Sequence, residues 1–350
     1  MTKFFFFNKK FNNFFLMNYL FLIMLFFSTM ITINASSWFN AWMGMEMNLM
    51  FFMPLMMNNF KKIKISNSMM IYFIIQASSS SFMMMMIIMM KMQFFLNKMN
   101  IMMNLIQMSL IMKLGASPFS WWMPKIMKNM NWMTLFIFLT WQKIGPLFLL
   151  IINNNNFIIY ISAILSSIFG TLMGLNQTMI KMLISYSSIN HLGWMMLSMM
   201  LNMKIFFLYF IIYSLINLMI CLFMNNLKLV FINQLFNYNN QNMLNKIILM
   251  SSFLSLAGIP PFLGFLPKFI LLIMMIKNKL FIEVIILIIM SVIALSFYIN
   301  PVISMMIFMK MNFKWNNKYF YINKSIFLII FFNMFINLIM VTPTFYNLIY

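Results

Sequence analysis

Long apolar runs separated by short polar gaps dominate this chain of 350 residues. A helix that crosses the hydrocarbon core of a bilayer needs roughly 20 apolar residues, because each residue adds about 1.5 Å. No sustained alternation with a period of two appears, which argues against a membrane barrel. The pattern therefore predicts an all-α integral membrane protein with about eleven transmembrane helices. The apolar runs span residues 14–34, 38–57, 69–90, 101–121, 132–152, 157–175, 177–200, 204–224, 247–276, 280–309 and 325–345.

The composition supports the membrane class. Hydrophobic residues make up 64% of the chain and charged residues only 7%, so there are too few polar groups to cover a water-exposed surface. The 23 basic and 2 acidic side chains give a net charge of +21, which is also typical of nucleic-acid-binding proteins. Here the lysines mostly occupy gaps between apolar runs, with more of them on the side of the N-terminus. This bias predicts membrane loops, an N-terminus on the matrix or cytoplasmic side, and no nucleic-acid partner.

The amino-acid usage indicates where the gene resides. The chain has 50 Met and 44 Phe but contains no Arg and no Asp. An AT-rich gene in which ATA is read as methionine, as in animal mitochondria, explains both features. We therefore expect a multi-pass protein of the mitochondrial inner membrane. Residues 1–16 are expected to be an N-terminal extension before a natural start at Met17, and residues 17–350 a single polytopic transmembrane domain.

Cofactor chemistry is not expected in this chain. Its one cysteine, Cys221, lies in an apolar run, whereas an Fe–S cluster takes about four cysteine ligands. The sequence also lacks a nucleotide-binding loop, a nucleophile triad and a metal-spaced cluster. We therefore expect no bound cofactor, no metal and no covalent chemistry in the chain itself.

An internal repeat interrupts two of the apolar runs. Residues 115–125 and 258–268 share glycine, proline, phenylalanine, proline and lysine at a constant offset of 143, which is 258 − 115. Proline removes a backbone donor and breaks or kinks a helix. Broken helices in membranes line cavities, because the freed carbonyls need polar partners. Paired breaks in the fourth and ninth runs, with repeat cores around 101–125 and 247–268, predict a transport site in inverted repeats. The alternative is two ordinary kinked helices.

Ionisable side chains inside the apolar runs are the main functional candidates, because a charge in the membrane is costly unless it is paired or hydrated. Glu46 lies in the second run, Lys113 two residues before the first break, and Lys143 near the middle of the fifth run. A lysine near a carboxylate can change charge when its neighbour does, as a proton relay requires. The alternatives are an acid held at a helix start and lysines that snorkel to an interface.

Two further candidates lie in the second half of the chain. Lys268 follows the second break, where it reaches either a cavity or a surface. His191 shares one helical face with Lys181, Ser185 and Ser188, because these positions follow helical steps of three and four. A histidine exchanges protons near neutral pH, and a lone histidine satisfied by a neighbour is the equal alternative.

Seven short stretches complete the picture: 42–48 (WMGMEMN), 113–119 (KLGASPF), 140–146 (TWQKIGP), 176–178 (NQT), 186–194 (YSSINHLGW), 256–261 (LAGIPP) and 264–268 (GFLPK). In sequence and order they resemble the NADH dehydrogenase subunit 2 family of mitochondrial complex I. The resemblance implies an antiporter-like subunit of the membrane arm, with other membrane-arm subunits as partners. It implies that Glu46, Lys113, Lys143 and Lys268 form a polar axis for proton translocation driven by quinone reduction elsewhere. It also implies that NADH, flavin, Fe–S clusters and ubiquinone are handled by other subunits.

Two positions depart from the family pattern. Ser120 stands where the family usually has His, and Lys125 stands where it usually has Glu. These changes weaken the expectation that protons enter at this loop. The sequence as a whole predicts a proton-translocating subunit of a redox-driven complex. The alternatives are a free-standing cation/proton antiporter of related fold and a subunit with a structural role only.

Overall fold

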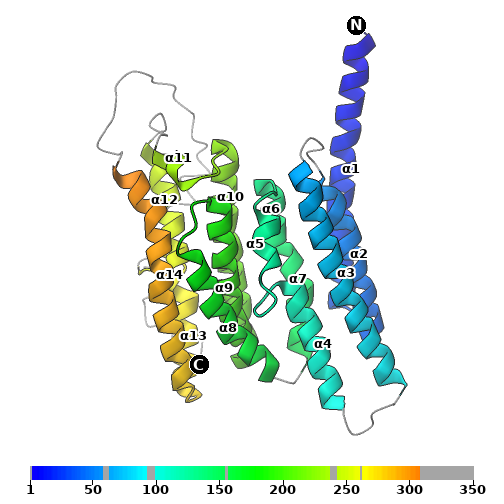
Figure 1. Cartoon of the computed structure of the whole chain (residues 1–350), viewed down its shortest axis with the longest axis vertical. Coiled ribbons are helices and arrows are strands. Elements are labelled where there is room, and N and C mark those ends of the chain that lie inside the picture. The colour runs from blue at the N-terminus through cyan, green and yellow to red at the C-terminus, as the bar shows by residue number, and fades with distance from the viewer. Residues whose placement is uncertain are drawn as a thin grey trace. The chain divides into compact units, whose positions relative to one another are not determined.

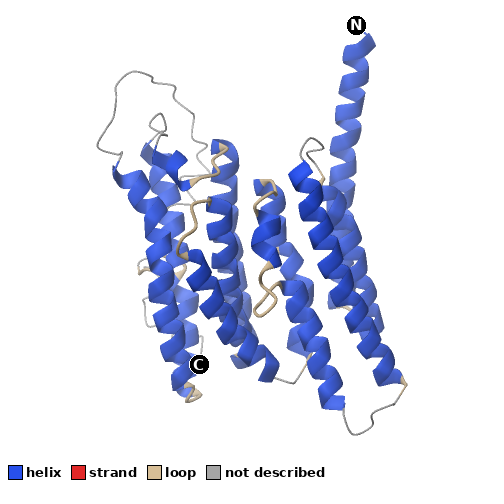
Figure 2. Ribbon diagram, viewed as in Figure 1, coloured by secondary structure: helices blue, strands red, loops and turns tan. Residues whose placement is uncertain are grey.

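A computed structural model describes residues 2–57, 63–92, 99–153, 157–236, 243–260 and 262–307. Helices account for most of these residues, and no strand occurs among them apart from an isolated bridge between Met179 and Phe231 (Figure 2). The chain divides into two compact units, Met1–Ser162 and Ala163–Tyr350. The run expected at residues 325–345 lies outside the described part of the chain.

Several helices have the length and composition of membrane spans. Five of those described are long and apolar enough to cross a membrane, and two shorter apolar helices accompany them. The prediction of an all-α integral membrane protein is therefore confirmed, whereas the number of spans stays a prediction. The five long helices are Ile65–Lys91, Trp132–Ile152, Phe157–Gly174, Met203–Leu227 and Phe281–Met306, and the shorter ones are Met17–Ile33 and Lys246–Ala257.

The described residues of the first unit form seven helices and the start of an eighth. Helices α1 and α2 are joined by a short connection in which the Ser37 side chain accepts a hydrogen bond of 3.3 Å from the Asn40 backbone N–H and so caps α2. The helices are α1 (Thr2–Ile33), α2 (Trp38–Met56), α3 (Ile63–Lys91), α4 (Met99–Leu114), α5 (Trp122–Met127), α6 (Trp132–Leu139), α7 (Trp141–Ile152) and the start of α8 (Phe157–Gly174), as labelled in Figure 1.

The second unit is built around α9, which is buried over nearly its whole length. A helix that is buried on all sides belongs to the centre of a bundle. The helices of this unit are the rest of α8, α9 (Ile180–Leu201), α10 (Met203–Leu227), α11 (Ile232–Phe236), α12 (Met243–Ala257), α13 (Phe265–Lys277) and α14 (Phe281–Ile307).

The two breaks predicted from the repeat are confirmed, one in each unit. Helix α4 ends at Leu114, and Gly115 takes a left-handed φ of +69°. Helix α12 ends at Ala257, and Gly258 takes a φ of +77°. Glycine adopts this conformation without the steric penalty of a Cβ. Because the two helix ends have the same backbone geometry, the repeat is present in the structure as well as in the sequence. The inverted orientation of the two copies stays a prediction.

Both helix ends have the hydrogen bonds of a Schellman motif. In the first unit the Gly115 N–H donates to the Met112 carbonyl at 3.2 Å, and the Ala116 N–H donates to the Ile111 carbonyl at 3.2 Å. In the second unit the corresponding bonds run from Gly258 to Ser255 at 3.1 Å and from Ile259 to Leu254 at 3.4 Å. All four partners match at the offset of 143 found in the sequence.

One helix boundary was not predicted. The run 132–152 is divided at Thr140, which has φ −111° and ψ −69° and separates α6 from α7. The Thr140 hydroxyl donates a hydrogen bond of 2.8 Å to the Phe136 carbonyl, the kind of side-chain bond that bends helices. Farther on, Pro146 lies inside α7 and removes another backbone donor. The break places Lys143 in the first turn of a new helix.

Helices α8 and α9 pack closely against each other in the second unit. A Cβ added to Gly193 would lie 2.6 Å from both the Ala163 carbonyl oxygen and the Ser166 Oγ. Small residues at such positions let two backbones approach, which drives helix association in membranes.

Gly193→Ala is expected to destabilise the protein by about 1–3 kcal/mol, because the new methyl group meets a backbone atom that cannot rotate away. The thermal unfolding midpoint of the detergent-solubilised protein in its native assembly should fall. Leu172→Val is the matched control, because Leu172 on α8 is 51% exposed and should leave the midpoint unchanged. An unchanged midpoint for Gly193→Ala would show that the two helices are free to separate slightly.

Candidate functional site

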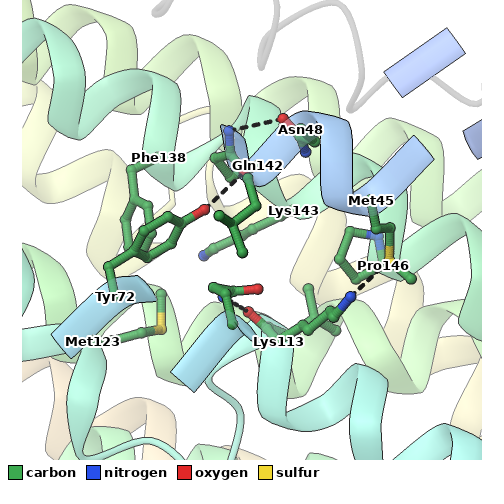
Figure 3. A pocket seen from close by; sticks show the side chains of 12 residues that line it. Met45, Asn48, Tyr72, Lys113, Met123, Phe138, Gln142, Lys143 and Pro146 are labelled. Atoms are coloured by element: carbon green, nitrogen blue, oxygen red, sulfur yellow. Dashed lines mark hydrogen bonds between the residues drawn. The ribbon is translucent and has the colours of Figure 1, made fainter. Parts of the chain in front are cut away.

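A polar cavity lies in the first unit, beside the break that ends α4. The volume that the centres of water molecules can occupy in it is about 30 Å³. One bound water needs roughly 10–15 Å³ by this measure, so the cavity is large enough for water. Figure 3 shows its lining side chains, with Tyr72 on one side and Met45 and Pro146 on the other. The lining residues are Met45, Asn48, Leu49, Tyr72, Gln76, Lys113, Leu114, Met123, Phe138, Gln142, Lys143 and Pro146. Two predicted relay lysines therefore share one cavity.

Lys113 occupies the last turn of α4 and is buried. Its Nζ donates to the Met45 sulfur at 3.8 Å, a weak contact for a cation. Burial disfavours the charge of this ammonium, and the negative charge of Glu46 offsets part of that cost. Glu46 itself lies on α2, is half-buried and is not among the cavity-lining residues. The structure thus places Glu46 close enough to influence the charge of Lys113, although the acid is not part of the cavity lining.

Lys143 lies in the first turn of α7, is only 2% exposed and lines the cavity. A chain of hydrogen bonds runs beside it. The Tyr72 hydroxyl donates to Gln142 Oε1 at 3.4 Å, and Gln142 Nε2 donates to Asn48 Oδ1 at 3.0 Å (Figure 3). These bonds join α2, α3 and α7 around the lysine and supply polar groups that can orient water.

Sequence reasoning did not assign Asn48, Tyr72, Gln76 or Gln142 to the site. A signal was present for two of them, because Asn48 follows Glu46 by two residues and Gln142 directly precedes Lys143. Tyr72 and Gln76 had no such neighbour in the sequence. They are one helical turn apart on α3, and only the packing of α3 against α4 and α7 brings them to the lysines.

The second unit places Lys268 at the second break. Lys268 is 5% exposed, so of the two predicted surroundings the structure selects the interior. Its Nζ donates to the carbonyls of Leu256 at 3.3 Å and Ala257 at 3.0 Å. The Nζ also lies 5.8 Å from the centre of the Trp194 ring, within the range of a cation–π interaction.

His191 lies on the buried face of α9, with Ser185 and Ser188. Its Nδ1 lies 2.8 Å from the Tyr209 hydroxyl, and its ring centre lies 5.3 Å from that of Tyr213. Tyr209 therefore gives the histidine a hydrogen-bonding partner. Neither tyrosine was singled out from the sequence.

The two departures from the family pattern lie at the first break. The Ser117 hydroxyl donates to the Ser120 hydroxyl at 3.3 Å. Lys125, which matches Lys268 in the repeat, is exposed, and its Nζ lies 4.9 Å from the centre of the Trp121 ring. The repeat therefore matches these lysines in position but not in surroundings.

The arrangement is suited to proton transfer. Three lysines lie beside helix breaks, and a glutamate and a histidine lie within apolar helices. Within the described residues, no group of three or more His, Cys, Asp or Glu side chains is placed to hold a metal ion. Buried ionisable groups beside broken helices define a class of ion-translocating membrane proteins.

Comparison with known proteins agrees with this class. Residues 35–294 match a family model described as NADH:quinone oxidoreductase/Mrp antiporter, transmembrane. The fold is similar to a chain in respiratory complex I from Thermus thermophilus, with TM-score 0.76, 17% identity, and coverage of 83% of this chain and 70% of that one. It is also similar to a chain of the membrane-bound sulfane sulfur reductase, an archaeal respiratory membrane complex, with TM-score 0.80, 17% identity, and coverage of 94% and 73%.

Sequence relatives narrow the class. The chain is 41% identical over 306 residues to NADH-ubiquinone oxidoreductase chain 2 of Anopheles gambiae, covering 86% of this chain and 88% of the relative. It is 40% identical to the chain of the same name from Aedes aegypti, covering 81% and 84%. This multi-pass membrane protein belongs to the NADH-ubiquinone oxidoreductase chain 2 family, and the resemblance seen in the sequence is confirmed.

Proposed function

We propose that this chain is a membrane-arm subunit of proton-translocating NADH:ubiquinone oxidoreductase. In that enzyme it takes part in proton translocation coupled to electron transfer from NADH to ubiquinone. The observation that carries the proposal is the cavity at the first break, where Lys113 and Lys143 line a space large enough for water. A scaffold has no need of two buried lysines there, since burying a charge is costly in a membrane.

The relay that we propose consists of Glu46, Lys113 and Lys143 in the first unit and Lys268 and His191 in the second. Glu46 stabilises the charge of Lys113, and the cavity gives Lys113 and Lys143 a shared path for water. When one group takes up a proton, its new charge favours or disfavours the charged form of its neighbour. Protons therefore move from group to group in steps. His191, whose Nδ1 lies 2.8 Å from the Tyr209 hydroxyl, is the titratable group that we assign to α9.

The proposal extends to cofactors, partners and location. The chain holds no redox cofactor, and NADH, flavin, Fe–S clusters and ubiquinone are handled by other subunits. Its partners are other membrane-arm subunits and the lipid bilayer. It resides in the mitochondrial inner membrane with its N-terminus on the matrix side, as the distribution of lysines between loops indicates.

Native-gel separation of mildly solubilised inner membranes tests this assignment. We expect the chain, identified by mass spectrometry, to migrate with NADH dehydrogenase activity in a very large complex. Reprobing the same gel for an unrelated respiratory complex controls for co-migration by size alone. A free chain or small oligomer, away from that activity, would overturn the proposal and favour the free-standing cation/proton antiporter.

A further inference from the structure

The carbonyl groups at the two helix breaks are satisfied in different ways. An α-helix leaves its last four carbonyls without intrahelical partners. The Schellman bonds satisfy two of them at each break, which leaves the carbonyls of Lys113 and Leu114 in the first unit. The matching carbonyls in the second unit are those of Leu256 and Ala257, since 256 − 113 and 257 − 114 both equal 143.

A neutral amide serves the first break and a lysine serves the second. In the first unit Gln76 Nε2 donates to the Lys113 carbonyl at 3.1 Å. In the second unit Lys268 Nζ donates to both Leu256 and Ala257. The C-terminal end of a helix carries partial negative charge, so this position favours a cation. Lys268 is thus the cap of α12 as well as a relay candidate.

Gly258 provides the room that this contact needs. A Cβ added to Gly258 would lie 2.8 Å from Lys268 Nζ, 3.0 Å from its Cδ and 3.2 Å from its Cε. At the other break, the three atoms nearest to a Cβ on Gly115 belong to Met123, at 2.5 and 2.6 Å, and to Trp122, at 3.1 Å. The two glycines therefore share a backbone conformation but face different side chains.

The indole of Trp194 bounds Lys268 from another helix. Trp194 lies on α9 and is 1% exposed, and its ring centre is 5.8 Å from the ammonium. The ammonium is therefore confined by the carbonyl end of α12, by Gly258 and by this ring. Lysine keeps at least two N–H donors whether charged or neutral. Held by two carbonyls, it can release and regain a proton without losing its place.

We propose that Gly258 is a positioning residue for Lys268: the absence of a Cβ at this left-handed position lets the lysine amine reach the carbonyl end of α12 and stay there through protonation changes. The inference rests on the proposed relay role of Lys268. A larger residue at position 258 displaces the amine from the carbonyls and leaves the relay without a fixed group at the second break.

A double-mutant cycle in the assembled complex separates this role from backbone strain. Gly258→Ala is expected to lower NADH:ubiquinone turnover per assembled complex about fivefold, a size within the range of coupling between contacting groups. In a Lys268→Met background, which should keep a measurable residual turnover, the same change should have almost no further effect. Gly115→Ala is the matched control, because it imposes the same left-handed strain. Its effect should be equal in both backgrounds.

The outcomes are distinct. If Lys268→Met leaves turnover unchanged, the relay role of Lys268 fails. If Lys268→Met lowers turnover but Gly258→Ala alone does not, the relay stands and the positioning role of Gly258 is wrong. If Gly258→Ala lowers turnover by the same factor with and without Lys268, Gly258 acts through the backbone and the inference is overturned.

Discussion

Lys143→Met is expected to lower NADH:ubiquinone turnover and proton pumping about tenfold or more, the scale of losing a positioned proton-transfer group, while the complex still assembles. Lys143 is 2% exposed at the cavity that it shares with Lys113. Methionine has a similar length and fills the same space without a charge or an exchangeable proton. Packing is thus preserved and the relay function is removed.

Activity and assembly must be measured on the same preparation. The amount of complex is read from a native gel, and turnover and pumping are divided by that amount. Lys204→Met is the matched control, because Lys204 is exposed at the start of α10, and it should change none of the three quantities. Full turnover and pumping in an assembled Lys143→Met complex would remove Lys143 from the relay. Loss of assembly with normal activity of the remainder would assign it a structural role.

The features of the fold that depend on local sequence could be predicted from the sequence. The apolar runs predicted the long helices, because only length and hydrophobicity are needed to span a bilayer. Gly115 and Gly258 marked the two breaks, because a left-handed residue ends a helix in a way that local sequence specifies. The break at Thr140 carried no comparable signal. Threonine is common inside membrane helices, and its effect depends on how α6 and α7 pack.

Helix α11 shows the same limit. Residues 225–246 lie between two of the predicted apolar runs, yet Ile232–Phe236 forms a short helix there. Its start is fixed by a backbone hydrogen bond of 3.0 Å from the Ile232 N–H to the Thr178 carbonyl. Such a contact joins residues far apart in sequence, so no local pattern could have indicated it.

The candidate site divides in a similar way. Buried ionisable groups were predictable, because each has a high cost in a membrane and so demands an explanation. Their neutral partners were not predictable. Burying a glutamine or tyrosine in an apolar helix has only a moderate free-energy cost, and its role depends on which residues it contacts. Gln76 is an example, because its role became visible only when the structure showed its amide donating to the Lys113 carbonyl on another helix.

The two copies of the repeat have the same backbone conformation at the break, but their matching lysines have different surroundings. Lys125 and Lys268 both lie three residues into the helix that follows a break. Lys268 turns inward to the carbonyl end of α12, but in the first unit Gln76 already serves the matching carbonyl and Met123 fills the space beside Gly115. With that space occupied, Lys125 lies at the surface. Side-chain packing, which a repeat alignment does not contain, decided the difference.

Glu46→Gln is expected to lower turnover per assembled complex roughly fivefold, because it removes the charge that stabilises the Lys113 ammonium. Glutamine keeps the shape and hydrogen-bonding capacity of the side chain, so assembly should persist. Glu283→Gln is the matched control, since Glu283 in the first turn of α14 is the other acid of the chain and is also half-buried. It should leave turnover unchanged.

The proposed mechanism also predicts how Glu46→Gln and Lys113→Met combine. If Glu46 acts through Lys113, its replacement should matter much less once Lys113→Met has removed the ammonium, and the double variant should turn over at about the rate of Lys113→Met alone. Independent roles would instead multiply the two losses, because the free energies of uncoupled sites add. Multiplied losses would place Glu46 elsewhere in the proton path, whereas coincident rates would establish that the carboxylate works by holding charge on the first lysine of the cavity.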